Sequence, residues 1–69
     1  MIVYTPLWKT MEKRGITQYT LIHQYHFSSG QLSRLRKNES VTVRTLDTLC
    51  DILQCDLKDV AVRITENKK

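Results

Sequence analysis

The sequence has little of what large, cross-linked or membrane-embedded proteins need. Two glycines and one proline in 69 residues are too few for the repeated chain reversals of an all-β sandwich, and this composition also argues against disorder. No apolar run approaches the roughly 18 residues of a membrane-spanning helix, and residues 1–4 lack the basic leader of a signal peptide. A domain of this size buries only about 60% of its unfolded surface, which leaves no room for an enclosed substrate cavity. We therefore expect one small cytoplasmic domain that is helical, is not an enzyme and contacts no membrane.

Cysteine is also scarce, because Cys50 and Cys55 are the only two. They are too few for a disulfide scaffold, and Cys50 falls on the apolar side of an expected helix, so we expect reduced thiols in a core. Together with His23 and His26 they would supply four zinc ligands, but the tight Cys-x2–4-Cys knuckle of zinc fingers is missing. Cysteine–histidine catalysis would need a cleft and an oxyanion donor, which so short a chain hardly supplies. The sequence thus predicts no metal, no cofactor and no small-molecule ligand.

Positive charge is concentrated in the N-terminal half. Residues 1–38 hold six basic side chains and one acidic side chain, a net charge of +5, whereas residues 39–69 hold five basic and six acidic ones, a net charge of −1. This asymmetry indicates that a polyanion faces the N-terminal half. The alternative is that the basic groups only keep the protein soluble.

Helix-start and helix-stop residues divide this half into short helices. Thr5, which is followed by proline, predicts the N-cap of a first helix that ends at Gly15. Thr17 predicts the cap of a second helix that ends near Tyr25, and residues 26–27 follow as a tight turn. Apolar residues recur on one side of both helices, as expected for helices packed on a core.

The third expected helix has a narrow apolar seam and a polar, basic outer face. Ser28 begins an S-x-x-Q capping box, in which the Gln31 side chain reaches back to the Ser28 N–H. Leu32 and Leu35 are its only apolar residues, and at 100° per residue they point the same way. The opposite side carries Gly30, Ser33, Arg34 and Lys37. We expect this helix to pack on a core while it presents its outer face to another molecule.

Beyond residue 40 the pattern predicts a long helix, a short helix and a strand. Thr42 predicts the cap of a fourth helix with apolar residues at i, i+3, i+4 and i+7. These residues are Leu46, Leu49, Cys50 and Leu53. Residues 56–60 predict a one-turn fifth helix with an aspartate cap, and residues 60–64 alternate as a short strand does, so we expect the apolar residues 2–4 to pair with them.

These elements predict an all-α domain with five helices and short terminal strands. The domain spans residues 1–69, with its core at about residues 5–62 and a frayed tail at residues 65–69. A short second helix, a tight turn and a third helix with a polar outer face describe a helix-turn-helix, whose second member enters the major groove of DNA.

One ordered set of residues carries a family resemblance. It consists of Gly15-Ile16-Thr17-Gln18, Leu21, Phe27-Ser28, Leu32-Ser33-Arg34-Leu35, the run from Thr45 to Asp56, and Asp59. With this set the chain resembles the XRE family of helix-turn-helix transcriptional regulators, the phage Cro and repressor type, and within it the small bacterial YozG-like branch. The resemblance covers residues 5–62 and implies a five-helix, lambda-repressor-like domain that binds operator DNA, often as a symmetric homodimer.

The resemblance also implies which residues touch double-stranded DNA. Gln18, at the start of the second helix, would contact phosphate and brace the third helix. Ser29 and Gly30 match positions that contact bases in the family, and Arg34 matches a base-contacting position one turn later. The planar guanidinium group of Arg34 can donate to two acceptors of guanine at once. The end of the third helix is placed to hold phosphate. The full expected set is Thr17, Gln18, Ser28, Ser29, Gly30, Gln31, Ser33, Arg34, Lys37 and Asn38.

Four residues qualify this interpretation. Ile22 stands where the family has a small residue, so the second and third helices would be spread or rotated. His26 stands where the family has a turn glycine, so it must accept a left-handed backbone or alter the turn. Gly30 offers no side chain for base contacts. Arg36 lies nearer the buried side, which makes it either a phosphate contact or a plain surface charge.

A function of a different class is compatible with the same residues. The fold could serve as a protein-interaction module, such as an antitoxin-like or regulatory partner, with weak or no operator binding. Its partner surface would then be the strand at residues 60–64 or the apolar chain ends. The basic outer face of the third helix favours DNA binding over this alternative.

Overall fold

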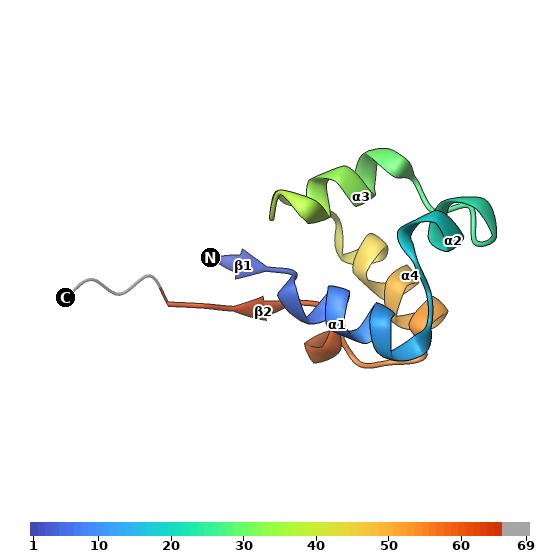
Figure 1. The fold of residues 1–69 in the computed structure, drawn as a ribbon. Helices are drawn as coiled ribbons and strands as arrows, with labels where there is room; N and C mark the ends of the chain where they lie inside the picture. The colour runs from blue at the N-terminus through green and yellow to red at the C-terminus, as the bar shows by residue number, and fades with distance from the viewer. Residues whose placement is uncertain (66–69) are drawn as a thin grey trace.

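The computed structural model describes residues 1–65 as a mostly helical fold with four α-helices, one 3-10 turn and two strands (Figure 1). In chain order the elements are β1 (Ile2–Val3), α1 (Thr5–Arg14), α2 (Gln18–His23), α3 (Ser29–Arg36), α4 (Val43–Leu53), the 3-10 turn η1 (Leu57–Asp59) and β2 (Val62–Arg63). The expected fifth helix is thus a single 3-10 turn. Most of the expected tail, residues 66–69, lies outside the described residues. Within residues 1–65, no helix combines the length and the apolar character needed to cross a membrane.

Helix α1 begins one residue earlier than its sequence predicts. Tyr4 is the N-cap and makes no side-chain capping bond, so Thr5 is the first helical residue and not the cap. A long-range contact explains this, because the Tyr4 backbone N–H donates to Asn38 Oδ1 at 3.0 Å and the Tyr4 hydroxyl donates to the Glu39 carbonyl at 3.0 Å. Gly15 ends the helix as predicted, with a φ of 71° in the left-handed region that glycine adopts without a Cβ penalty.

Side-chain caps begin α2 and α3 at the predicted residues. Thr17 Oγ1 accepts a hydrogen bond from the Thr20 N–H at 3.1 Å, and Ser28 Oγ accepts one from the Gln31 N–H at 3.3 Å. The predicted capping box is only half formed, because the Gln31 side chain turns toward α4 and accepts a hydrogen bond from the Thr45 hydroxyl at 3.4 Å. The expected return of Gln31 to the Ser28 N–H is therefore wrong.

The turn between α2 and α3 forms without glycine. Helix α2 ends at His23, slightly before the predicted end near residue 25, and the Gln24 N–H still bonds to the Thr20 carbonyl. His26 adopts a left-handed backbone with a φ of 56°, at a conformational cost that a glycine would avoid. Ile22, where a small residue was expected, is partly buried and packs against the core.

Helix α4 matches its prediction, and the one-turn helix predicted at residues 56–60 forms as a 3-10 turn and not as a fifth α-helix. Thr42 caps α4 by accepting a hydrogen bond from the Thr45 N–H at 3.2 Å. The segment that follows α4 makes a single 3-10 turn, η1. Asp59 Oδ2 accepts a hydrogen bond from the Asp56 N–H at 3.1 Å, which caps this turn at its start. Val60, the residue after η1, is fully buried in the core. The helical turn ends before it, and β2 begins two residues later.

The two chain ends pair as a small antiparallel sheet. Ile2 lies opposite Arg63 and Val3 lies opposite Val62, which confirms the expected terminal strands. Strand β2 is shorter than the predicted strand at residues 60–64. In Figure 1 this two-stranded ribbon projects sideways from the helical body.

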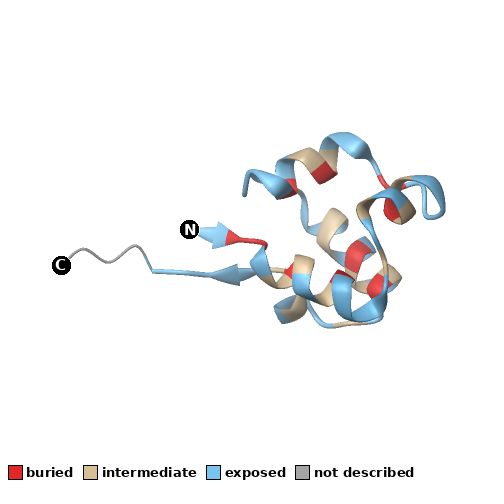
Figure 2. Cartoon of the chain, in the orientation of Figure 1, coloured by how far each residue is buried: buried red, intermediate tan, exposed pale blue. Residues whose placement is uncertain are grey.

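A single core holds the helices together. Buried residues, red in Figure 2, occur on each of the four α-helices and form one cluster. They are Tyr4, Leu7, Met11, Leu21, Phe27, Leu32, Leu35, Leu49, Leu53 and Val60. Both leucines of the predicted α3 seam are fully buried, at 0% exposure. The free thiols Cys50 and Cys55 pack at the edge of this core and are only half-buried, so their predicted place in the core is only partly correct.

Candidate nucleic-acid interface

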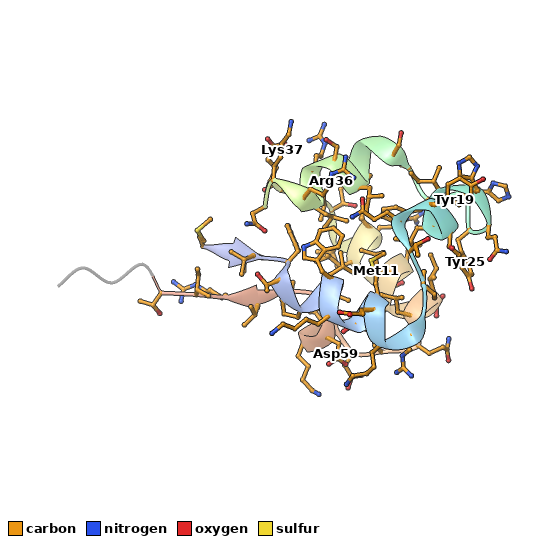
Figure 3. The ribbon with its side chains drawn as sticks, in the orientation of Figure 1. Met11, Tyr19, Tyr25, Arg36, Lys37 and Asp59 are labelled. Carbon is orange, nitrogen blue, oxygen red and sulfur yellow. The ribbon has the colours of Figure 1, made fainter. Side chains whose placement is uncertain are left out.

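Helix α3 lies on the core by its leucine seam and turns its other side to solvent. Arg34, Arg36 and Lys37 are exposed. In Figure 3 the Lys37 side chain extends away from the molecule, whereas Asp59 lies on the opposite side. Three of the six basic side chains of residues 1–38 thus form a basic side at α3. The other three lie on α1, where Arg14 lines a hollow together with Asp56 and Asp59 at η1, the acidic side.

The expected DNA-binding residues gather at the start of α2 and along α3. Thr17 is the N-cap of α2 and Gln18 is its first residue. The other eight residues run from the N-cap of α3 to the residue after its C-cap. The exposed members are Thr17, Ser28, Ser29, Gly30, Arg34, Lys37 and Asn38, and the partly buried members are Gln18, Gln31 and Ser33. The set therefore lies on α2 and α3 or directly beside their ends.

A hydrogen bond between two side chains joins the two parts of this set. Arg36 Nη1 donates to Gln18 Oε1 at 2.6 Å, so the start of α2 is tied to the last turn of α3. Because Arg36 carries a charge, this bond belongs to the stronger class of charge-assisted hydrogen bonds. The sequence left the role of Arg36 open, since its partner lies 18 residues away on another helix. A contact of Gln18 with phosphate stays a prediction.

Two members of the set have side-chain oxygens that already serve the fold. Gln31 Oε1 accepts from the Thr45 hydroxyl, and Asn38 Oδ1 accepts from the Tyr4 backbone N–H. Asn38 also has a left-handed backbone, with a φ of 57°. The amide N–H groups of Asn38 take no part in its bond to Tyr4. Nothing local in the sequence signals these contacts, because the partners lie 14 and 34 residues away.

The glycine at the start of α3 is not required by the backbone. Gly30 does not have a positive φ, and a Cβ atom placed on it would meet only Ser28 Oγ at 3.6 Å, an ordinary van der Waals distance. An alanine would therefore fit here in the protein without DNA. What the glycine provides is an unobstructed backbone at the exposed, N-terminal end of α3.

Histidines and cysteines lie in different surroundings. The His23 ring stacks on the Tyr19 ring, with centroids 4.1 Å apart. Cys50 and Cys55 line a hollow whose other walls are Arg14, Asp47, Asp51, Gln54, Asp56 and Asp59. Burial is the largest cause of the raised pKa of each thiol, which favours the protonated form over the thiolate. Within residues 1–65, no group of three or more histidine, cysteine or acidic side chains is arranged to hold a metal ion.

Comparison with known proteins identifies the kind of domain. The family model described as Cro/C1-type HTH DNA-binding domain matches residues 6–66. A crystal structure described as the transcriptional regulator VanUg is similar to this chain with a TM-score of 0.83 and 29% sequence identity, and the match covers 94% of this chain and 87% of that one. No curated protein sequence matches significantly.

Proposed function

We propose that this chain, which belongs to the Cro/C1-type helix-turn-helix DNA-binding domain family, is a transcriptional regulator that reads operator DNA by placing α3 in the major groove. The observation that carries the proposal is the exposed outer face of α3, which is basic and is tied to the start of α2 by the bond between Arg36 and Gln18. Phosphates crossing that face would be attracted by its positive charge, while the acidic side at η1 points away.

The proposed contacts divide between base edges and phosphates. Arg34, which lies in the last turn of α3, reads a base pair in this proposal, because its planar guanidinium group matches the two acceptors of guanine in the major groove. Ser29 and Ser33 supply shorter hydroxyl contacts, and the bare backbone at Gly30 allows close approach. The caps of α2 and α3, Thr17 and Ser28, lie at helix N-termini, where backbone N–H groups favour phosphate.

The end of α3 holds the backbone of the duplex in this proposal. Lys37 lies at the C-cap of α3 and supplies a point charge to phosphate. The free amide N–H groups of Asn38 donate to the same region, since its oxygen is engaged with Tyr4. Gln18 and Gln31 are in the same situation, because Arg36 and Thr45 engage only their Oε1 atoms and leave their amide N–H groups to donate to DNA.

A salt titration tests this function directly. Binding of a fluorescent duplex of random sequence is measured by anisotropy from low to high salt. We expect the logarithm of the binding constant to fall by about 0.9 per phosphate contact for each tenfold increase in salt. Lys58→Ala is the control, because Lys58 is exposed on η1, the acidic side, and its loss should not weaken binding. A salt slope near zero would contradict the proposal and favour the protein-interaction module.

A further inference from the structure

The two cysteines of the chain lie at the end of α4, outside the surface proposed for DNA. Cys50 belongs to the last turn of α4, and Cys55 is the second residue after this helix. Both are free, half-buried thiols. They line the same open hollow, which has a volume of about 480 Å³ and also reaches Asp59. Because Asp59 lies on the opposite side of the molecule from Lys37 (Figure 3), the two thiols are remote from the outer face of α3.

A left-handed residue folds the chain back and brings the two cysteines together. Gln54 has a φ of 54°, a conformation that a residue other than glycine adopts only at a cost. This turn directs the Gln54 N–H to the Asp51 carbonyl at 3.3 Å and the Cys55 N–H to the Cys50 carbonyl at 3.0 Å. The two bonds form a Schellman motif, in which the side chains of the first and last residues commonly touch.

The second of these bonds limits the distance between the two cysteines. Since backbone bond lengths are fixed, an N–H···O=C bond of 3.0 Å between their backbones holds the two Cα atoms within about 6.5 Å of each other. Disulfides usually join cysteines whose Cα atoms are roughly 4.4 to 6.8 Å apart. The backbone is therefore already placed for a bridge between Cys50 and Cys55.

The two thiols also contact each other. Burial is the largest cause of the raised pKa of both, and the hydrogen bond between them raises the pKa of Cys50 further but lowers the pKa of Cys55. These opposite effects identify the Cys50 thiol as the donor and the Cys55 sulfur as the acceptor. The Arg14 guanidinium also lowers the pKa of Cys55, whereas the neighbouring Asp59 raises it. Only Cys55 has neighbours that favour its thiolate, the form that attacks a disulfide.

Apolar packing alone would also place two side chains in contact at the end of a helix. Packing does not require that both sulfur atoms line a hollow open to solvent, as these two do. A small reagent in water can therefore reach them.

We propose that Cys50 and Cys55 form a reversible dithiol–disulfide site that reacts with low-molecular-weight disulfides. The Cys55 thiolate attacks one sulfur of the small disulfide, so that a mixed disulfide forms and one small thiolate leaves. The Cys50 thiolate then attacks the Cys55 sulfur and expels the second small thiolate. The two protein sulfurs are oxidised, the small disulfide is reduced to two thiols, and the protons lost by Cys50 and Cys55 end on these thiols. This site goes beyond the proposed function and does not depend on it.

Closure of the disulfide would tie the end of α4 to the segment that leads into η1. These two elements pack against each other, so the bond reinforces a contact that the reduced protein already makes. Because the Cα atoms are already within reach, α3 keeps its position. The bond also restricts the unfolded chain, so the oxidised protein should unfold at a higher urea concentration than the reduced one.

A redox titration of the full chain tests the site. The protein is equilibrated with mixtures of reduced and oxidised glutathione, quenched with acid and alkylated, and its mass then shows the number of free thiols and of attached glutathiones. We expect oxidising mixtures to yield a chain with no free thiol and no glutathione, from which dithiothreitol restores both thiols. Closure should be on the order of 10-fold more favourable for the folded chain than for the same chain in urea.

Three results of this titration would overturn the proposal. The first is two free thiols in every mixture, and the second is glutathione on both cysteines without an internal disulfide. The third is equal closure in urea and in its absence, because the fold would then contribute nothing. Comparison of the folded and unfolded wild type needs no variant, so it is decisive even where a substitution impairs folding.

Single variants test the roles of the two sulfurs. Cys50→Ser and Cys55→Ser should each stop at one attached glutathione, and thermal unfolding shows whether each variant is folded. Cys50→Ser retains Cys55 beside Arg14 and should react several-fold faster than Cys55→Ser, since its thiolate is the better supported one. The reverse order would overturn the assignment of Cys55 as the attacking thiol.

DNA binding separates this site from the proposed function. The reduced and oxidised proteins should bind a random duplex with affinities that agree within about twofold, because the hollow and α3 lie on opposite sides. A larger difference would overturn the statement that closure leaves α3 in place. Absence of DNA binding in both states, with the disulfide forming as expected, would count against the proposed function alone.

Discussion

At the scale of single residues, Arg34 and Lys37 test how α3 reads DNA. Arg34 lies in the last turn of α3 and Lys37 lies three residues later, at its C-cap, so we assign base edges to Arg34 and phosphate to Lys37. Arg34→Ala should cost roughly 1 to 3 kcal/mol on the best site and relax the preference at one base pair. Lys37→Ala should weaken binding to all sequences about equally and reduce the salt slope by about one unit. Titrations on matched and scrambled duplexes measure both effects.

Thermal unfolding provides the control for these two variants. Neither residue lies on the buried seam of Leu32 and Leu35, so both variants should keep their stability within about 0.5 kcal/mol of the parent. Equal losses on both duplexes for Arg34→Ala would mean that this arginine only touches phosphate. No loss for either variant would mean that this face of α3 is not the DNA surface.

Substitution of Gly30 tests whether this glycine serves DNA binding or the fold. Because a Cβ atom would meet only Ser28 Oγ at 3.6 Å, Gly30→Ala should stabilise the protein by roughly 0.5 to 1 kcal/mol through helix propensity. If the bare backbone allows close approach to DNA, the same variant should bind its best duplex several-fold more weakly. Urea unfolding and anisotropy measure the two effects. A variant that is more stable and binds equally well would show that no close approach occurs at this residue.

What could be predicted at the residue scale depended on how far away each partner lies. The caps Thr17, Ser28 and Thr42 were correct, because a cap bonds to a backbone N–H three residues along the chain. Gln31 was misassigned, because its partner Thr45 belongs to another helix. The same reason hid the bond between Asn38 and the backbone N–H of the residue before α1.

At the scale of elements, α4 offers a clean test of the cap. Thr42 Oγ1 accepts from the Thr45 N–H at 3.2 Å, whereas Thr48 Oγ1 donates to the Arg44 carbonyl within the same helix. Thr42→Ala should cost about 1 kcal/mol of unfolding free energy, because it leaves a helix N-terminal N–H without its acceptor. Thr48→Ala is the matched control and should be neutral or slightly stabilising, since alanine has the higher helix propensity. Urea unfolding that gave equal losses would contradict the role of the cap.

The elements that the sequence misjudged are those that tertiary contacts shape. Periodicity predicted α4 and the α3 seam correctly, because both follow from residues three and four apart. Helix α1 gained a residue at its start because Tyr4 is held by the loop after α3. The predicted one-turn fifth helix is the 3-10 turn η1 and not an α-helix, and directly after it Val60 enters the core and the chain pairs with β1. The periodicity of a short segment does not reveal contacts with residues that are far away in the chain.

At the scale of the whole molecule, three surfaces differ in chemistry. Helix α3 carries the basic face, η1 and the end of α4 carry the acidic hollow, and the ribbon with the start of α4 carries apolar side chains. The acidic and apolar surfaces adjoin at Asp47 and Cys50. The sequence predicted the first from the spacing of residues along α3. It named the apolar chain ends only as a partner surface for a different function. Their place beside α4 depends on strand pairing between residues more than 60 apart.

The arrangement of these surfaces predicts the form of the operator. If two copies of the chain join as a symmetric dimer, their α3 helices are related by a two-fold axis and face the same side of the duplex. Selection of duplexes from a random library should then yield an inverted repeat with half-site centres about 34 Å apart, or a multiple of that distance, because successive major grooves on one side of DNA repeat with the helical turn. Inserting about five base pairs between the half-sites should abolish the gain over a single half-site, since it rotates one of them to the far side, whereas inserting a full turn should be tolerated better. An asymmetric site bound by one copy, with no dependence on spacing, would show that the chain regulates as a monomer.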